Sequence, residues 1–576
     1  MPTVNISVHL KEMAERQPTQ LAVLFPISRD PSTGRNNYAS YTYKRLDEES
    51  DFLAAGLEEI GIGRGVKTVL MVPPSLEFFS LTFALFKVGA VPVLVDPGMG
   101  IKNLGKCLSE ARPDAFIGVT KAHLARILFG WGRSTIKQLV TVGRRLGWSG
   151  FNLTDLIRQG QIRQTQATPT TSPWRAAETE SNETAAILFT SGSTGVPKGA
   201  VYSHGNFAAQ VAALKQAFQI EPGEIDLCTF PLFALFAPAL GMTAVVPRMD
   251  FTKPARVDPR EIEVPIETFA INNLFGSPAL LNRVGRAWES AALPTDQVGV
   301  RDQNRPKTWP SIRRVLSAGA PVSPLILERF SRRLSADTQI FTPYGATESL
   351  PVAVIGSHEI LRETQHLTAK GAGTCVGRPV DGIEVQIIGI NDGPIAEWSD
   401  DLRVARGEIG EIVVHGPMVT QTYYNRPDLS ALAKILDPAT GRMRHRMGDL
   451  GYFDDQGRLW FCGRKSHRVV TSDRTYFTEP VEGVFNTHPA IFRTALVGVT
   501  RGDGIEPVLC VERERGLPLS NQTLTRELLV IGERFEHTRT IRTILYHSRF
   551  PVDIRHNSKI FREKLAFWAT KRLRSH

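Results

Sequence analysis

The sequence predicts an α/β protein with a large N-terminal domain of mixed, mostly parallel sheets with flanking helices, followed by a small α+β C-terminal domain. Over most of the chain, apolar strand-like runs alternate with helix-like stretches, which is typical of βαβ units. After Gly463-Arg464 this alternation gives way to a shorter α+β pattern. The length of 576 residues also exceeds what one hydrophobic core usually serves. We therefore divide the chain into residues 1–464 and residues 465–576.

The first predicted elements form a βαβ unit. Residues 41–57 carry apolar side chains at three- and four-residue spacing, which predicts an amphipathic helix. Residues 68–72, 77–89 and 90–95 then predict a strand, a helix and a second strand. Residues 122–131 predict a half-buried helix whose end is aromatic and basic. Because basic residues flank bulky apolar ones there, contact with a membrane surface or a partner protein is an alternative interpretation.

Composition narrows the class of protein. The net charge is +10 and 42% of the residues are hydrophobic, as in an ordinary globular protein. The basic residues are scattered and no recognition motif is present, so we expect no nucleic-acid binding. Five cysteines without CxxC spacing argue against disulfides and zinc, and the N-terminus lacks a signal-peptide pattern, so we expect a cytoplasmic protein.

One uncharged run, residues 227–247, has the length that a membrane helix requires. Pro231, Pro238 and Gly241 interrupt it, which is unfavourable inside a spanning helix. Its bulky apolar side chains fit a buried wall instead. We therefore predict a core or substrate-channel segment and no transmembrane segment.

Residues 189–199 read Phe-Thr-Ser-Gly-Ser-Thr-Gly-Val-Pro-Lys-Gly and follow an apolar, strand-like run. Hydroxyls, glycines and one lysine after a strand present several donors to a phosphate chain, so the segment predicts a triphosphate loop. It is not a Walker A loop, because Pro197 precedes the lysine and Gly199 follows it. A second strand is expected next, with Lys198 moving with the loop. A simple Ser/Gly hairpin turn is the alternative.

Five further segments follow this loop in order. Each is common turn chemistry by itself, but their joint order and spacing are specific. Together they resemble the adenylate-forming superfamily of acyl-CoA synthetases, peptide-synthetase adenylation domains and luciferases. The resemblance implies activation of a carboxylate as acyl-AMP with ATP and Mg²⁺, release of pyrophosphate, and a small mobile C-terminal lid. The segments are Ser-Ala-Gly-Ala-Pro at 317–321, Tyr-Gly-Ala-Thr-Glu at 344–348, His-Arg-Met-Gly-Asp-Leu at 445–450, Gly-Arg-Lys at 463–465 and Asn-Ser-Lys-Ile-Phe-Arg at 557–562.

The resemblance also implies roles for individual residues. Glu348 would hold Mg²⁺, which suits a hard carboxylate oxygen, and Thr347 would contact the α-phosphate. Asp449 would accept both ribose hydroxyls, and Lys559 would reach from the lid to the α-phosphate and the substrate carboxylate. The other implied nucleotide contacts are Thr190, Ser191, Gly192, Ser193, Thr194, Gly195 and Lys198 in the phosphate loop, Gly319, Ala320, Pro321 and Tyr344 in the adenine slot, and Arg464 before the hinge.

The chain departs from the usual motifs of the superfamily at several positions, and two of these bear on thioester formation. Ala234 stands where thioester-forming members usually have a histidine, and Asp473 stands where a glycine admits the thiol arm. The pattern most resembles the β-lactone synthetases of bacterial long-chain olefin biosynthesis. Those enzymes adenylate a 2-alkyl-3-hydroxy fatty acid, and the 3-hydroxyl of the same molecule then attacks the activated carbonyl. Because the two groups are tethered, the reaction has a high effective molarity. The resemblance implies a long-chain hydroxy fatty acid as substrate and other olefin-pathway enzymes as candidate partners.

Two alternatives remain open from the sequence. An ordinary long-chain fatty-acid–CoA ligase would share the same adenylation motifs. A nucleotide-dependent scaffold would bind ATP without chemistry, and replacement of Lys559 would then leave its function intact.

Overall fold

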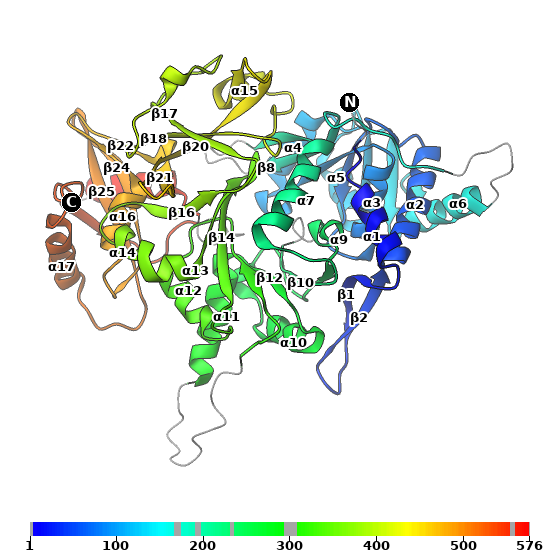
Figure 1. Ribbon diagram of the computed structural model, residues 1–576, viewed down its shortest axis with the longest axis horizontal. Coiled ribbons are helices and arrows are strands. Elements are labelled where there is room, and N and C mark those ends of the chain that lie inside the picture. The colour runs from blue at the N-terminus through cyan, green and yellow to red at the C-terminus, as the bar shows by residue number, and fades with distance from the viewer. Residues whose placement is uncertain are drawn as a thin grey trace, which may run out of the picture.

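The computed structural model describes residues 4–165, 174–190, 197–230, 235–292, 308–552 and 559–574. These residues form the mixed α/β architecture that the sequence predicts. Figure 1 shows the N-terminal region, in blue to cyan, and the C-terminal region, in orange to red, at opposite ends of the long axis, with the middle of the chain between them. Residues 191–196 of the predicted phosphate loop and residues 231–234 lie outside the described residues.

The predicted βαβ unit is confirmed near the N-terminus. Helix α2 (Tyr43–Glu59) begins after Thr42, whose side chain accepts a hydrogen bond from the Arg45 amide. Helix α3 (Leu76–Lys87) is capped in the same way by Ser75 and connects two paired parallel strands. Those strands are β3 (Lys67–Met71) and β4 (Val91–Val95).

A seven-stranded sheet contains this unit and leads into the phosphate loop. Its order is β7-β6-β5-β3-β4-β8-β9, and all neighbours are parallel except β8 and β9, which are antiparallel. Apolar, β-branched runs such as Val91–Val95 suit a parallel sheet with both faces covered. The remaining strands are β5 (Ala115–Val119), β6 (Gln138–Val142), β7 (Phe151–Asn152), β8 (Thr184–Thr190) and β9 (Lys198–Ser203).

A fourteen-stranded sheet forms the centre of the molecule. Strands β11, β10, β12, β13 and β14 run parallel, and the strands from β14 to β21 pair antiparallel. The strands are β1 (Leu21–Arg29), β2 (Asn36–Thr42), β10 (Ile225–Cys228), β11 (Thr243–Val245), β12 (Asn273–Phe275), β13 (Arg314–Leu316), β14 (Gln339–Ala346), β15 (Ser349–Gly356), β16 (Thr374–Pro379), β17 (Glu384–Ile388), β18 (Gly410–His415), β19 (Lys434–Asp437), β20 (Arg442–Phe453) and β21 (Leu459–Arg464).

Helices cover both large sheets (Figure 1). Their inward faces supply the main hydrophobic clusters, in which residues such as Leu53, Leu81 and Leu280 are fully buried. The helices are α1 (Val8–Arg16), α4 (Ile101–Ala111), α5 (Thr120–Phe129), α6 (Leu153–Thr165), α7 (His204–Phe218), α9 (Phe236–Leu240), α10 (Arg260–Phe269), α11 (Pro278–Ala292), α12 (Pro324–Ser331), α13 (Ser357–Glu359), α14 (Gln365–Thr368) and α15 (Pro427–Ala433).

The chain after Arg464 forms its own sheets. They pack with α16 (Thr478–Phe485), α17 (Asn521–Glu533) and α18 (Arg562–Arg574). The Thr374 hydroxyl donates to Glu479 at 2.8 Å, which links this part to β16. The division at residues 464 and 465 and the mobility of the lid stay predictions. The strands are β22 (Val469–Val470), β23 (Thr475–Tyr476), β24 (Ile491–Arg501), β25 (Gly504–Arg513) and β26 (Thr543–Tyr546).

The uncharged run at residues 227–247 contributes to the core. It contains the end of β10 together with α9 and β11, and side chains such as Leu227, Leu240 and Val245 are buried. Among the described residues, no helix combines the length and apolarity needed to cross a bilayer. A role of this run as a wall of the acyl channel stays a prediction.

Candidate active site

The two ends of the predicted phosphate loop are fixed by a pair of antiparallel strands. Thr190 at the end of β8 pairs with Lys198 at the start of β9. Lys198 is therefore the first residue of a strand, and its movement with the loop stays a prediction. Its Nζ lies 5.0 Å from the centre of the Tyr423 ring. Burial lowers the pKa of Lys198, and the charge of Glu348 opposes that effect.

Thr347 and Glu348 lie in the tight connection between β14 and β15. The Ala346–Ser349 pair closes this connection and holds both residues between the strands. The Tyr202 hydroxyl donates to the carbonyl of Thr347, and the Tyr423 hydroxyl donates to the Glu348 carboxylate. Glu348 is only 8% exposed, so its charge interacts strongly with its neighbours.

The surroundings of Glu348 keep its carboxylate ionised. Burial alone would raise the pKa of Glu348, but the Tyr423 hydroxyl and the charges of Lys434 and Lys198, joined in acid by protonated His445, hold it well below its usual range. Burial and the nearby Lys434 lower the pKa of His445 to about 3, so its imidazole is neutral at pH 7. The site therefore presents a buried anion between two lysines.

Sequence reasoning missed Tyr202, Tyr423 and Lys434. Lys434 is buried because β19 pairs with β20, where it lies opposite His445. Its ammonium donates to the Thr420 side chain at 3.2 Å, and the Thr420 amide donates to the Glu348 carbonyl at 2.9 Å. These contacts join residues far apart in the chain, and no local pattern signals them. The one available signal was that Lys434 lies close in sequence to the His445 segment.

The ribose side of the site is built on the β20–β21 pair. Asp449 lies directly opposite Arg464 in the strand register, and Arg464 Nη1 lies 2.9 Å from Asp449 Oδ1. The Tyr344 hydroxyl donates to Asp449 Oδ2 at 2.7 Å. Burial raises the pKa of Asp449, while Arg464 and Tyr344 limit the rise. The structure thus brings three residues from separate sequence segments into direct contact.

The Ser-Ala-Gly-Ala-Pro segment follows β13, which pairs with β14, the strand that carries Tyr344. It leaves the carboxyl end of β13, where Leu316 pairs with Phe341 on β14, three residues before Tyr344. Gly319 has φ +97°, a conformation that favours glycine. Ligands of open parallel sheets bind at the carboxyl ends of strands, which is where Gly319, Ala320 and Pro321 lie.

Lys559 faces the same region from the C-terminal part of the chain. It is half-buried, and its positive charge acts on Asp449 and on His467. Burial, with Arg562, Arg464 and Lys559, lowers the pKa of His467 to about 3. Arg562 pairs with Glu482 through both guanidinium nitrogens, which anchors the start of α18 against α16. Lys559 therefore lies at the Asp449 side of the site.

The residues present fit ATP and a magnesium ion. Asp449 Oδ1 is buried and its recorded contact is the ion pair with Arg464, with no hydrogen bond recorded from the described residues, so a lone pair remains for a ligand hydroxyl. The ionised Glu348 is a hard oxygen ligand. In the part of the chain that the structure describes, no cluster of three His, Cys, Asp or Glu side chains forms a complete metal site. Mg²⁺ usually takes one or two carboxylates and completes its shell with phosphate and water oxygens, which suits a single Glu348.

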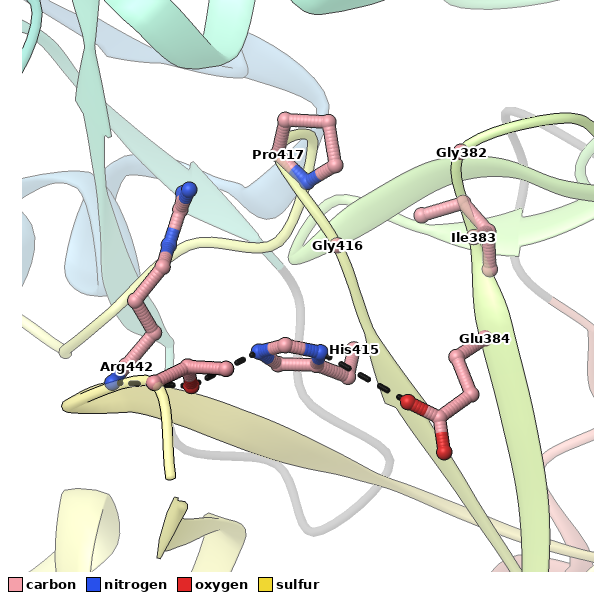
Figure 2. A pocket seen from close by; sticks show the side chains of 8 residues that line it. Gly382, Ile383, Glu384, His415, Gly416, Pro417 and Arg442 are labelled. Carbon is pink, nitrogen blue, oxygen red and sulfur yellow. Dashed lines mark hydrogen bonds and ion pairs between the residues drawn. The ribbon is translucent and has the colours of Figure 1, made fainter. Parts of the chain in front are cut away.

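A separate cavity of about 640 Å³ opens at the ends of β17 and β18 (Figure 2). His415 lies between Thr440, 3.3 Å from its Nε2, and Glu384, 3.7 Å from its Nδ1. Figure 2 shows His415 joined to Glu384 by a dashed line, with Arg442 on the other side of His415. The cavity contains none of the predicted site residues, so it is distinct from the candidate active site.

Lys434 provides a test of the electrostatics at this site. Burial lowers its pKa from 10.5 to about 7, although Glu348 raises it. Between these two values the unfolded chain binds more protons at this lysine than the folded chain does. The contribution of Lys434 to the free energy of unfolding therefore rises as the pH increases from about 7 to about 10. We expect the unfolding temperature of the wild type minus that of Lys434→Met, both measured without ATP, to increase over this pH range. A constant difference would contradict the lowered pKa.

The fold and the site together define the class of protein. A model of the AMP-binding enzyme family matches residues 10–424, and the chain belongs to this family. Over 573 residues it is 49% identical to an olefin beta-lactone synthetase from Stenotrophomonas maltophilia, covering 99% of this chain and 98% of that protein. The corresponding synthetase of Xanthomonas campestris is 48% identical, with 98% of each chain covered. The amide bond synthetase McbA from Marinactinospora thermotolerans shares the fold, with a TM-score of 0.75, 21% identity, and 98% and 99% of the two chains covered.

Proposed function

We propose that this protein adenylates a long-chain 2-alkyl-3-hydroxy fatty acid and closes the product to a β-lactone. The observation that carries the proposal is 49% identity, over almost the whole chain, to a protein named olefin beta-lactone synthetase. The contacts among Tyr344, Asp449 and Arg464, and the ionised Glu348, support the ATP-dependent half of the reaction. We place the enzyme in the cytoplasm, with olefin-pathway enzymes as its partners.

In the first half-reaction, a carboxylate oxygen of the fatty acid attacks the α-phosphorus of ATP, and pyrophosphate leaves. Two anions must approach, so positive charge is needed where negative charge develops. In this proposal Lys198, Arg464 and Lys559 supply it, and Asp449 orients the ribose. Mg²⁺ held by Glu348 neutralises charge on the phosphates when it is bound. Thr347 contacts the α-phosphate in this scheme.

In the second half-reaction, the substrate's own 3-hydroxyl oxygen attacks the activated acyl carbon. A C–O bond forms within the molecule, the hydroxyl proton passes to water, and AMP leaves with the electron pair of the broken acyl–phosphate C–O bond. Because nucleophile and electrophile are tethered, effective molarity offsets part of the strain of a four-membered ring. The apolar run at residues 227–247 would line the path of the alkyl chains.

The loop near Asp473 supports the absence of an external thiol acceptor. Asp473 lies between β22 and β23, and the Thr471 hydroxyl donates to its carboxylate at 2.7 Å. This hydrogen bond lowers the pKa of Asp473, so the side chain is anionic at neutral pH. An anionic side chain at the position of the expected glycine would hinder the approach of a thiol arm.

The test is incubation of the full chain with ATP, Mg²⁺ and a long-chain 2-alkyl-3-hydroxy acid, without coenzyme A. We expect β-lactone, AMP and pyrophosphate, detected by mass spectrometry. The matched substrate lacking the 3-hydroxyl should still support pyrophosphate exchange but give no lactone. Thioester that forms only after coenzyme A is added, with equal use of both acids, would establish a fatty-acid–CoA ligase instead.

A further inference from the structure

The outer face of helix α5 exposes an unusual amount of apolar surface. Leu124 is 49% exposed, Ile127 53%, Leu128 77% and Phe129 45%. Ile101, at the start of the neighbouring helix α4, is 56% exposed. Single exposed apolar residues are common on protein surfaces, but a contiguous group usually marks an interaction site. We call these five residues the α5 patch.

Positive charge surrounds the α5 patch. Residues 115–154 contain six basic residues and no aspartate or glutamate. Lys121, near the start of α5, and Arg133, four residues after its end, are both exposed. The carbonyl of Arg144 accepts a hydrogen bond from the Thr120 hydroxyl, which brings the Arg144-Arg145 pair to the start of the helix. An apolar patch within a basic border is complementary to a surface that is both apolar and anionic.

A cavity of about 520 Å³ joins the patch to helix α4. Lys102 and Lys106, one turn apart on α4, line it together with Phe129 and Trp131. The nearby acidic residues point elsewhere, because Glu110 pairs with Arg426 at 3.8 Å and Asp114 pairs with Lys67 at 3.3 Å. The cavity therefore offers two ammonium groups beside aromatic rings, which suits an anionic headgroup next to acyl chains.

The inner side of α5 is firmly packed, so the patch is a fixed surface. His123 is buried, lies 2.9 Å from the Val140 carbonyl and stacks on Trp148 with ring centres 5.1 Å apart. Trp131 is 7% exposed and stacks against Phe129 at 5.5 Å. The inner side of α5 therefore leaves no space for the exposed apolar side chains, and only a binding partner could bury them.

We propose that the α5 patch docks onto an anionic lipid bilayer, with Ile127, Leu128 and Phe129 entering the interface and Lys102 and Lys106 binding lipid phosphates. Apolar insertion combined with several basic contacts gives reversible peripheral binding without a membrane-spanning helix. The proposal rests on the surface alone and goes beyond the proposed reaction.

The experiment is co-sedimentation of the full chain with phosphatidylglycerol vesicles, with phosphatidylcholine vesicles as the neutral reference. The wild type should bind the anionic vesicles more tightly, and high salt should remove the difference because it screens the charges. Leu128→Ser should weaken binding by about ten- to a hundredfold, since an inserted leucine is lost. The double variant Lys102→Glu, Lys106→Glu should weaken binding to anionic vesicles by at least about tenfold.

Val530→Ser is the matched control, because Val530 is 55% exposed on helix α17, away from the patch. It should bind like the wild type, and all variants should keep the wild-type unfolding temperature. The proposal is overturned if the wild type does not sediment with anionic vesicles, or if Leu128→Ser binds them as tightly. Self-association that Leu128→Ser abolishes, without vesicle binding, would also overturn it and would assign the patch to a second copy of the chain.

Discussion

Lys559→Ala is expected to lower the rate of adenylation by about 10²- to 10³-fold, the usual loss when one charge-stabilising donor is removed from a transition state. The ammonium of Lys559 acts on Asp449, which places it at the nucleotide side of the site. If it serves the transition state, kcat should fall while the KM for ATP changes little. ATP–pyrophosphate exchange with saturating fatty acid measures both constants.

Lys564→Ala is the matched control for this variant. Lys564 lies five residues further along, is exposed, and has its Nζ 4.5 Å from the Phe561 ring. It should retain wild-type exchange activity. Full activity of Lys559→Ala would contradict the assignment of Lys559 and favour a scaffold that binds ATP without chemistry.

Asp449→Asn is expected to raise the KM for ATP by about a hundredfold, because hydrogen bonds to a charged group each contribute about 1.5–3 kcal/mol. The change also removes the negative partner that lies 2.9 Å from Arg464. The loss should appear in nucleotide binding, so ATP should no longer raise the unfolding temperature of the variant at concentrations that stabilise the wild type.

Tyr344→Phe is a milder change at the same site, and its KM for ATP can be compared with that of Asp449→Asn. It removes the hydroxyl that donates to Asp449 at 2.7 Å but keeps the carboxylate and its charge. The KM for ATP should rise by less than in Asp449→Asn. An ATP affinity of Asp449→Asn equal to that of the wild type would exclude the predicted contact with the ribose hydroxyls.

The fold could be predicted because local patterns and packing agree. The βαβ unit was visible in the apolar spacing of residues 41–95, and α2 and α3 lie within two residues of the predicted limits. The extent of antiparallel pairing between β14 and β21 could not be predicted in this way, since strand partners depend on contacts far apart in the chain. The pairing of Lys198 with Thr190 likewise has no local signature in the sequence.

The sequence could predict those residues of the site that belong to recognisable motifs. Tyr344, Asp449 and Arg464 were identified from short segments, and the structure brings their side chains together. Tyr423 and Lys434 were not identified, because their importance comes from burial beside Glu348 rather than from any sequence pattern. Buried charges of this kind depend on the complete fold.

The strand register that places Asp449 opposite Arg464 limits where the protein tolerates insertions and deletions. The turn between β20 and β21 is closed by hydrogen bonds between Asp454 and Arg458. Successive side chains of a strand point to opposite faces, so an insertion of one residue after this turn would direct Arg464 away from Asp449. We infer that the strand segments between this turn and the Asp449–Arg464 pair accept almost no insertions or deletions beyond the register shift already present between Leu450 and Gly451. Homologous chains should therefore vary in length elsewhere.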